Sequence, residues 1–315
     1  MTDFTGHDRA DKPKSPLGQR LDAPLDALDL PGLAARWFGG VLRFRLQGLA
    51  AFAADPGLPG RIRGALGERL KLSASEAAIA GQPCPWQPPC AFEVLWRKQG
   101  RMSAGLDHAS PWVIGLDPVA GDLEVTLTLF GFANEFMAAA SEAMTAALLG
   151  DVDWRGATGL FVPRLSILER QIGEAAAIEA PPPLDTLRLA MLSPLALTGA
   201  DPRERPGSLV SGLARRLETL ARWHDATLAP LVDPRALGQR AAALDWQFDE
   251  VVVLNWQRGS RRQDKAIPMR GIVCGIEISG LGPDDADLRL LLALGEACFF
   301  GADVAFGCGR YALAG

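Results

Sequence analysis

The stretch Asp122–Phe132, DLEVTLTLFGF, decides which fold class this 315-residue chain can adopt. Its apolar residues Leu123, Val125, Leu127 and Leu129 alternate strictly with other residues. Such alternation is typical of a β-strand with one buried face. Residues 134–149 follow at once, are rich in alanine and methionine, and end before a glycine, which predicts a helix. The sequence therefore places a strand and a helix in direct succession here.

The neighbouring segments extend this strand–helix pattern in both directions. Residues 40–52 alternate well enough for an earlier strand, and residues 159–169 form a later strand candidate. Between them, residues 59–72 carry Ile62, Leu66 and Leu70 at four-residue spacing, which predicts a helix. The first half thus has the order strand–helix–loop–strand–helix–strand, which resembles that of a ferredoxin-like unit.

The second half repeats this order after the linker EAPPP at residues 179–183. Its predicted elements are strands at 185–195, 251–256 and 267–278, helices at 208–228, 234–244 and 285–300, and a glycine-rich closing segment at 301–311. We therefore predict an α+β fold of two tandem ferredoxin-like (RRM-like) domains. The predicted boundaries are a flexible tail at 1–35, a first domain at 36–180 and a second domain at 184–315.

Composition excludes several classes of protein. With 48% apolar and 22% charged residues the chain suits a folded protein rather than a disordered one. No apolar run is long enough to span a bilayer, and the polar N-terminus has no signal peptide, so we expect a cytoplasmic protein without a membrane partner. The five cysteines lack the pairing expected of a disulfide framework. Cys84 and Cys90 could form half of a zinc site, but no second pair lies nearby, so we expect a proline-rich loop and no metal.

The net charge of −5 argues against a nucleic-acid partner, yet the distribution of charge matters more than its sum. The densest basic stretch, RGSRRQDK at 258–265 followed by Arg270, holds five cations and one acid. Such a stretch is either a solvated surface or a phosphate-binding segment. Arg61 and Arg63 add two cations at the start of a predicted helix, where the helix dipole disfavours them.

Motifs along the chain resemble those of Cas6 CRISPR RNA-processing proteins of the RAMP superfamily. The closing segment LGEACFFGADVAFGCGRY at 294–311 resembles the family pattern L-G-x-x-x-H-x-G-K-x-x-x-F-G-x-G-x-Y. Upstream, W-x-R-G-S-x-R-Q at 256–263 resembles W-x-R-Y-S-x-R-Q, and Gly271 fits a glycine that follows it. In the first half, RGALG at 63–67, the cysteine-bearing loop at 84–90 and LFGFAN at 129–134 resemble further family segments in the same order. The likeness extends over residues 40–315.

This resemblance implies a protein that binds CRISPR repeat RNA and cuts it without a metal or other cofactor, by attack of a 2′-hydroxyl on the scissile phosphate. Glycines allow close approach of backbone N–H groups to phosphates, and arginines offer planar forks for phosphate oxygens or bases. The expected RNA-binding residues are Arg61, Arg63, Arg258, Ser260, Arg261, Arg262, Gln263, Lys265, Gly301, Gly307, Gly309 and Arg310.

The chain departs from the family at the residues expected to cut. Phe299 and Ala302 stand where the pattern has histidine and lysine, and neither can serve as acid, base or cation. The candidates that remain are His224, Arg258 and Arg262, with His108 a weaker one and His7 in the predicted tail. Three hypotheses stay open: a pre-crRNA endoribonuclease, a non-cleaving RNA-binding subunit that also contacts other Cas effector subunits, and an α+β protein without an RNA role.

Overall fold

The structure, a computed structural model, describes residues 15–103, 105–154, 166–197, 201–260 and 265–314. Its helices are α1 (Pro16–Asp22), α2 (Leu30–Arg36), α3 (Leu58–Leu72), α4 (Glu76–Ile79), α5 (Ala91–Leu95), α6 (Met137–Gly150), α7 (Gly207–Ala221), α8 (Pro234–Ala242) and α9 (Ala286–Cys298), with 3₁₀ turns η1 (Ala50–Ala54), η2 (Gly131–Phe136), η3 (Arg222–His224), η4 (Pro283–Asp285) and η5 (Val304–Phe306). Its strands are β1 (Asp26–Ala27), β2 (Gly39–Leu46), β3 (Arg101–Ser103), β4 (Leu106–Asp107), β5 (Trp112–Val119), β6 (Asp122–Phe130), β7 (Ile167–Glu174), β8 (Thr186–Met191), β9 (Leu195–Ala196), β10 (Ala226–Thr227), β11 (Asp245–Ser260), β12 (Lys265–Ser279) and β13 (Tyr311–Ala314).

The N-terminal half is built on a four-stranded antiparallel sheet of order β5-β6-β2-β7. Helix α3 follows β2 and α6 follows β6, as predicted, but β5 lies in a segment that was expected to be a loop, so the prediction missed this strand. Strand β6 buries Leu123, Val125, Leu127 and Leu129 completely, as its alternation requires. The tight turn from β5 to β6 places Ala120 and Gly121 at φ 50° and 88°, as a two-residue turn between right-twisted strands demands.

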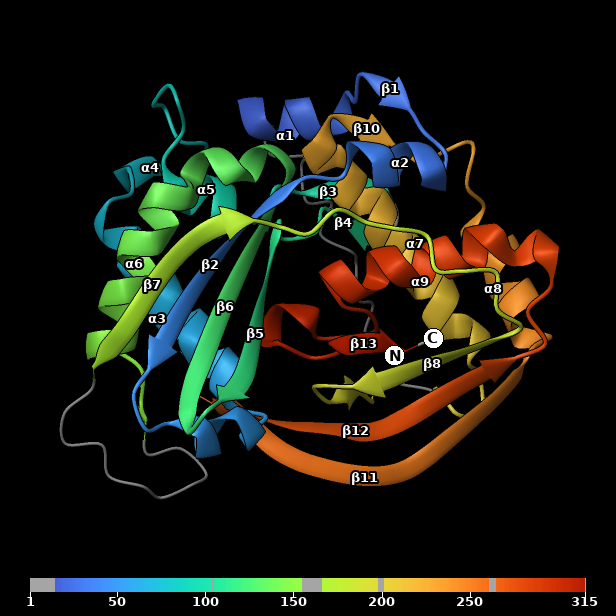
Figure 1. The fold of residues 1–315 in the computed structure, drawn as a ribbon. Helices are drawn as coiled ribbons and strands as arrows, with labels where there is room; N and C mark the ends of the chain where they lie inside the picture. The colour runs from blue at the N-terminus through green and yellow to red at the C-terminus, as the bar shows by residue number, and fades with distance from the viewer. Residues whose placement is uncertain (1–14, 104, 155–165, 198–200, 261–264, 315) are drawn as a thin grey trace, which may run out of the picture.

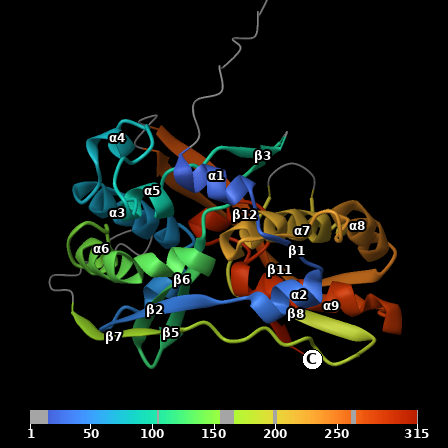
Figure 2. The same ribbon diagram turned by 90° about the horizontal axis from the view of Figure 1, so that it is seen from above.

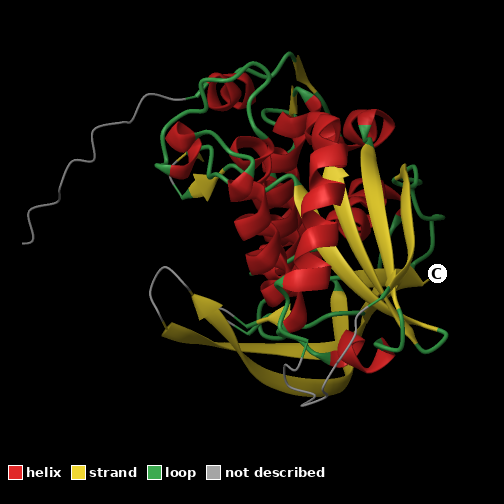
Figure 3. Cartoon of the chain, turned by 90° about the vertical axis from the view of Figure 1, so that its left-hand side faces the viewer, coloured by secondary structure: helices red, strands yellow, loops and turns green. Residues whose placement is uncertain are grey.

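The C-terminal half repeats this architecture in a sheet of order β11-β12-β8-β13, with β9 added beside β12. Helix α7 lies between β8 and β11 in sequence, and α9 lies between β12 and β13. The long strands β11 and β12 pair from Asp245–Ser279 to Ser260–Lys265 and form a curved hairpin that runs under the rest of the molecule (Figure 1). Figure 3 shows the same hairpin projecting beneath the helices.

The two halves share one continuous hydrophobic core. Trp223 packs on Phe132 with ring centroids 4.9 Å apart, and its indole nitrogen donates to the carbonyl of Ala109 at 3.0 Å. Seen from above, the halves lie side by side, and the chain crosses between them along residues 175–185 (Figure 2). None of the helices in the described ranges is both long and apolar enough to cross a membrane.

The prediction of a flexible tail at 1–35 is wrong for residues 15–35, which form α1, β1 and most of α2. Leu17, Leu21, Leu30 and Leu33 supply buried faces at helical spacing. Side-chain oxygens cap both helices, since Ser15 and Asp29 accept from backbone amides three residues later. Strand β1 also pairs with β10, so this segment joins the N-terminus to the C-terminal half. Residues 1–14 lie outside the described part.

Two of the strands predicted in the first half change their bounds. The strand expected at 159–169 is β7 at Ile167–Glu174, and residues 155–165 lie outside the described part of the chain. The strand expected at 40–52 ends at Leu46, because the chain turns at Gly48, where φ is 70°, and then enters η1. Both shifts concern the ends of strands and leave their order unchanged.

Candidate nucleic-acid interface

Two arginines from distant parts of the sequence meet on one aromatic ring. Arg63 lies in the second turn of α3, Arg258 lies near the end of β11, and Phe306 ends η5 in the glycine-rich closing segment. The guanidinium carbons of Arg63 and Arg258 lie 4.8 and 4.3 Å from the centroid of the Phe306 ring. These distances are within the range of cation–π contacts. We call these three residues the arginine–phenylalanine cluster.

Two tryptophans support Arg63 from the N-terminal half. Its guanidinium carbon lies 4.4 Å from the ring centroid of Trp96 and 5.9 Å from that of Trp112, and the two indoles are stacked. Trp112 is fixed by its indole N–H, which donates to the carbonyl of Leu95 at 2.6 Å. Burial, and to a smaller extent the nearby charge of Arg258, lowers the pKa of Arg63 to about 10. Arg63 remains cationic at neutral pH.

The cluster has cations without matching carboxylates. Among the described residues neither Arg63 nor Arg258 forms an ion pair, and the Nε atom of each is buried without a hydrogen bond. Arg61, two residues earlier in α3, differs because it pairs with the buried carboxylate of Asp55 at 2.6 Å. Two adjacent cations that lack a carboxylate partner favour an anion, and a guanidinium suits a phosphate in particular.

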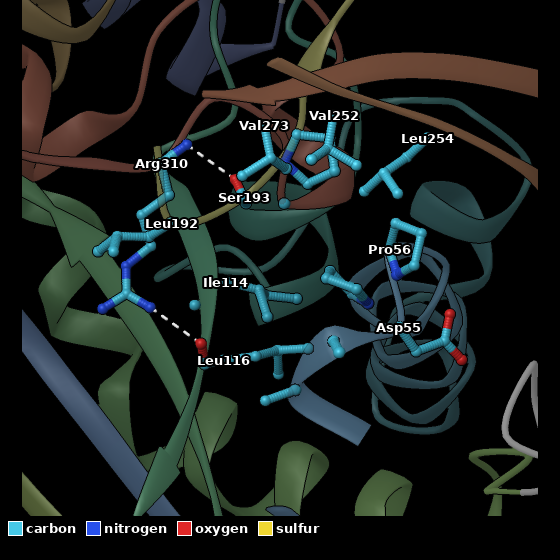
Figure 4. Close-up of a pocket in the computed structure, with 16 residues that line it drawn as sticks. Asp55, Pro56, Ile114, Leu116, Leu192, Ser193, Val252, Leu254, Val273 and Arg310 are labelled. Atoms are coloured by element: carbon cyan, nitrogen blue, oxygen red, sulfur yellow. Dashed lines mark hydrogen bonds between the residues drawn. The ribbon is translucent and has the colours of Figure 1, made fainter. Parts of the chain in front are cut away.

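A cavity of about 370 Å³ adjoins the cluster, between the two halves (Figure 4). Pro59 and Gly307, which contact each other beside the cluster, both line it. Most of its wall is aliphatic, from Ile114, Leu116, Leu192, Val252, Leu254 and Val273. The cavity and the cluster together offer an apolar space next to an aromatic ring and two guanidinium groups.

The amides of two closing glycines, Gly307 and Gly309, are engaged within the protein. The amide of Gly307 donates to Val304 at 2.9 Å and that of Gly309 donates to Pro194 at 2.9 Å, so neither is free for a phosphate. A side chain is excluded at both, because a Cβ would come within 2.4 Å of Pro59 at Gly307 and within 1.7 Å of the Phe300 carbonyl oxygen at Gly309. Both have φ near 80°, as does the exposed Gly301. These glycines let the segment pack tightly and place Phe306.

Arg310, predicted to contact RNA, is engaged inside the protein. Its guanidinium donates to the carbonyl oxygen of Leu116 on β5 of the other half at 3.1 Å (Figure 4). It also pairs with Asp117, the next residue of β5, at 2.8 Å. The side chain therefore ties the closing segment to the N-terminal sheet. Sequence alone did not distinguish this arginine from Arg258, because its acidic partner is 193 residues away.

The rest of the predicted basic segment is described only at the ends of β11 and β12. Arg261, Arg262 and Gln263 lie outside the described residues. Ser260 and Lys265 face each other in the last register position of the two strands. Ser260, the last residue of β11, lies two positions beyond Arg258.

Neither histidine candidate lies at the cluster. His224 is buried, stacks on Trp37 at 4.8 Å and meets Phe38 edge-on at 5.0 Å. Burial lowers its pKa to about 4, although Asp225 and the backbone of Arg36 oppose this, and neither ring nitrogen makes a well-aligned hydrogen bond. His108 is also buried, with its Nε2 3.0 Å from Asp22. Both histidines are therefore packed inside the protein rather than at the cluster.

The two positions where the family pattern has histidine and lysine are structural here. Phe299 is 5% exposed and closes α9 with φ 64° and ψ 163°, a conformation that is costly for any residue except glycine. Ala302 forms an isolated β-bridge with Ala196. The described residues contain no group of three or more histidine, cysteine or carboxylate side chains arranged to hold a metal ion.

Sequence reasoning missed the aromatic part of the cluster. Phe306 was noted only as a match to the closing pattern, and Trp96 and Trp112 received no role. The available signal was the position of Phe306 directly before Gly307, in a segment otherwise made of small residues. The partnership of these rings with Arg63 and Arg258 depends on tertiary structure alone.

The architecture defines a class: a mixed α+β protein with antiparallel sheets that share one core. No family model and no curated protein matches the sequence. Solved structures do match. The product complex of the Thermus thermophilus Cas6 protein TTHB231 aligns with TM-score 0.51 and 14% identity over 88% of this chain and 99% of that chain. The product complex of the Cas6 protein TTHA0078 aligns with TM-score 0.51 and 19% identity over 88% of this chain and 100% of that chain. The chain has the Cas6-like fold.

Proposed function

We propose that this protein binds CRISPR repeat RNA, as pre-crRNA or crRNA, through the arginine–phenylalanine cluster. In this proposal each half is a ferredoxin-like domain, at 36–180 and 184–315, and the cluster lies where the two domains meet. The observation that carries the proposal is that Arg63 and Arg258 lie together on Phe306 without a carboxylate partner among the described residues. The Cas6-like fold supports the identity of the RNA.

Each part of the cluster has a property that RNA binding requires. A phosphate beside the two guanidinium groups would relieve their mutual repulsion and accept hydrogen bonds from their terminal Nη–H groups. The Phe306 ring offers a surface for base stacking, as in other proteins that bind single-stranded RNA. The apolar cavity beside Pro59 provides space for a base that is turned out of the strand.

A gel-shift titration with cognate repeat RNA at low salt tests this proposal. We expect Arg63→Ala and Arg258→Ala each to weaken binding about tenfold, which corresponds to about 1.4 kcal/mol. The matched control is Arg188→Ala, on strand β8, because Arg188 already has a carboxylate partner in Glu277 at 2.7 Å. Absence of binding by the wild-type protein, or equal losses for all three variants, would contradict the proposal.

Metal-independent cleavage by 2′-hydroxyl attack is a second candidate, supported by the same pair of cations. Arg63 and Arg258 could stabilise the charge that develops on a phosphorane. Arginine is a poor general base at neutral pH, so any cleavage through Arg258 or Arg262 would be slow. The surroundings of Phe299, Ala302 and His224 favour the alternative of a non-cleaving subunit that holds RNA and contacts other Cas effector subunits.

Labelled repeat RNA incubated with the protein in EDTA distinguishes these alternatives. A single cut that leaves a cyclic phosphate, and that is lost in Arg258→Ala but kept in Arg188→Ala, would establish cleavage. Intact RNA that stays bound would establish the non-cleaving role.

A further inference from the structure

Two free thiols lie against each other at the base of the CPWQPPC loop. Cys84 and Cys90 are both buried, and their side chains are within hydrogen-bonding reach of one another. The Sγ atom of Cys84 also accepts hydrogen bonds from the backbone amide of Cys90 and from the hydroxyl of Ser75, each at 3.3 Å. Neither thiol belongs to the arginine–phenylalanine cluster. Three polar groups thus converge on a single sulfur atom.

The two thiols differ in their readiness to ionise. Burial opposes ionisation of Cys84, but the hydrogen bonds from Ser75 and from the amides of Cys90 and Trp86 outweigh it and lower its pKa. Burial raises the pKa of Cys90, and the neighbouring Cys84 raises it further. Cys84 is therefore the sulfur suited to attack, and Cys90 is suited to keep its proton until a second step.

A cavity gives small molecules access to Cys84. It has a volume of about 320 Å³ and is lined by Cys84 and its loop neighbours Pro85, Trp86, Gln87 and Pro89 on one side, and by residues of α1 on the other. Trp86, on this wall, is half exposed. This volume is several times that of a hydrogen peroxide molecule, so the cavity can admit one.

We propose that Cys84 and Cys90 form a redox-modification site, in which a hydroperoxide converts the two thiols to an intramolecular disulfide. The Cys84 thiolate attacks the peroxide O–O bond, which yields a Cys84 sulfenic acid and, with one proton, water. The Cys90 thiol then attacks the Cys84 sulfur, forms the S–S bond and releases the sulfenic oxygen as a second water. Two thiols and one hydrogen peroxide thus give one disulfide and two waters. The thiols are oxidised and the peroxide is reduced.

The disulfide would change the position of the neighbouring helix α5. Cys90 directly precedes α5, and Trp96 directly follows it. Bond formation brings the two sulfur atoms from contact to about 2.05 Å, so it must move Cys84, Cys90 or both. Because Trp96 supports Arg63, this movement reaches the arginine–phenylalanine cluster.

Peroxide treatment of the native full-length protein, followed by alkylation of free thiols and peptide mapping, tests the site. We expect a Cys84–Cys90 linked peptide that has lost the mass of two hydrogens, and its return to two alkylated thiols after reduction. In Cys90→Ser the reaction should stop at a Cys84 sulfenic acid that dimedone traps, whereas Cys84→Ser should give no adduct at Cys90. The control Cys274→Ser, which removes a buried thiol of β12, should form the disulfide as the wild type does.

The proposal is overturned if Cys84 and Cys90 stay fully alkylatable after treatment of the wild type, or if dimedone labels Cys90 in Cys84→Ser rather than Cys84 in Cys90→Ser. The wild-type measurement decides this even if a serine variant fails to fold. The effect on the cluster rests on the proposed RNA binding and has a separate readout: repeat-RNA affinity before and after oxidation. A failure of RNA binding in both states would leave the disulfide site standing.

Discussion

His224 shows how a single buried side chain makes stability depend on pH. Its pKa falls from 6.5 to about 4 in the folded protein because burial disfavours the charged ring. The unfolded chain therefore binds a proton at a higher pH than the folded chain does. The stabilising contribution of the neutral ring is complete above pH 6.5 and is lost progressively as the pH falls to about 4. The total loss is about 3 kcal/mol.

We expect His224→Phe to remove this part of the pH dependence. The substitution keeps an aromatic ring against Trp37 and sacrifices no well-aligned hydrogen bond. Urea unfolding at several pH values should give similar free energies for wild type and variant at pH 7, and a flatter curve for the variant between pH 6.5 and 4. If the two curves stay parallel, His224 is not the responsible group. If His224→Phe alone abolishes RNA cleavage, the assignment of His224 as a packed residue is wrong.

Gly309 illustrates a glycine that close packing requires. Its φ is 78°, and a Cβ would lie 1.7 Å from the carbonyl oxygen of Phe300. We expect Gly309→Ala to lower the free energy of unfolding by about 3 kcal/mol or more, from backbone strain together with the clash. Gly212→Ala, in α7 with open space at the Cβ position, is the matched control and should raise it by about 0.5–1 kcal/mol. Equal effects at the two glycines would contradict this account.

At the scale of elements, the spacing of apolar residues was sufficient to predict a strand or helix where one of its faces is buried. Strand β6 and helix α3 were predicted almost to the residue because their apolar spacing reports directly on the core. The helices α1 and α2 were missed, because seven residues give too few turns for a period to stand out. Strand β7 was misplaced for another reason: it lies at the edge of its sheet and is mostly exposed, so it lacks the alternation that marks a strand.

The candidate site was predictable only in part for a related reason. Arg258 and Arg63 stood out in the sequence as cations in unusual positions, and the structure brings both to Phe306. Arg310 stood out equally, yet it is held by Asp117. A local pattern shows that a charge is present, whereas its partner is set by tertiary contacts that span most of the chain. For the same reason, the sequence did not reveal that Trp96 and Trp112 contact Arg63.

At the scale of the whole molecule, the two halves should unfold together. Their cores are continuous, and Trp223, Phe132 and the Arg310–Asp117 ion pair join them at separate points. We expect differential scanning calorimetry to show one transition, with calorimetric and van't Hoff enthalpies in a ratio of about one. Two resolved transitions would show that the predicted domains at 36–180 and 184–315 are energetically independent.

The overall charge makes a further prediction about RNA binding. Because the net charge is −5, long-range attraction cannot supply the affinity, and binding must depend on a few local cations. A plot of log affinity against log salt concentration should therefore have a modest negative slope. Arg63→Ala should make this slope about one unit shallower, because it removes one phosphate contact. Phe306→Leu should weaken binding while the slope stays the same, since stacking on an uncharged ring releases no counterions. If Phe306→Leu changes the slope as much as Arg63→Ala does, the ring only positions the two arginines. If neither variant alters affinity, RNA is bound elsewhere on the molecule.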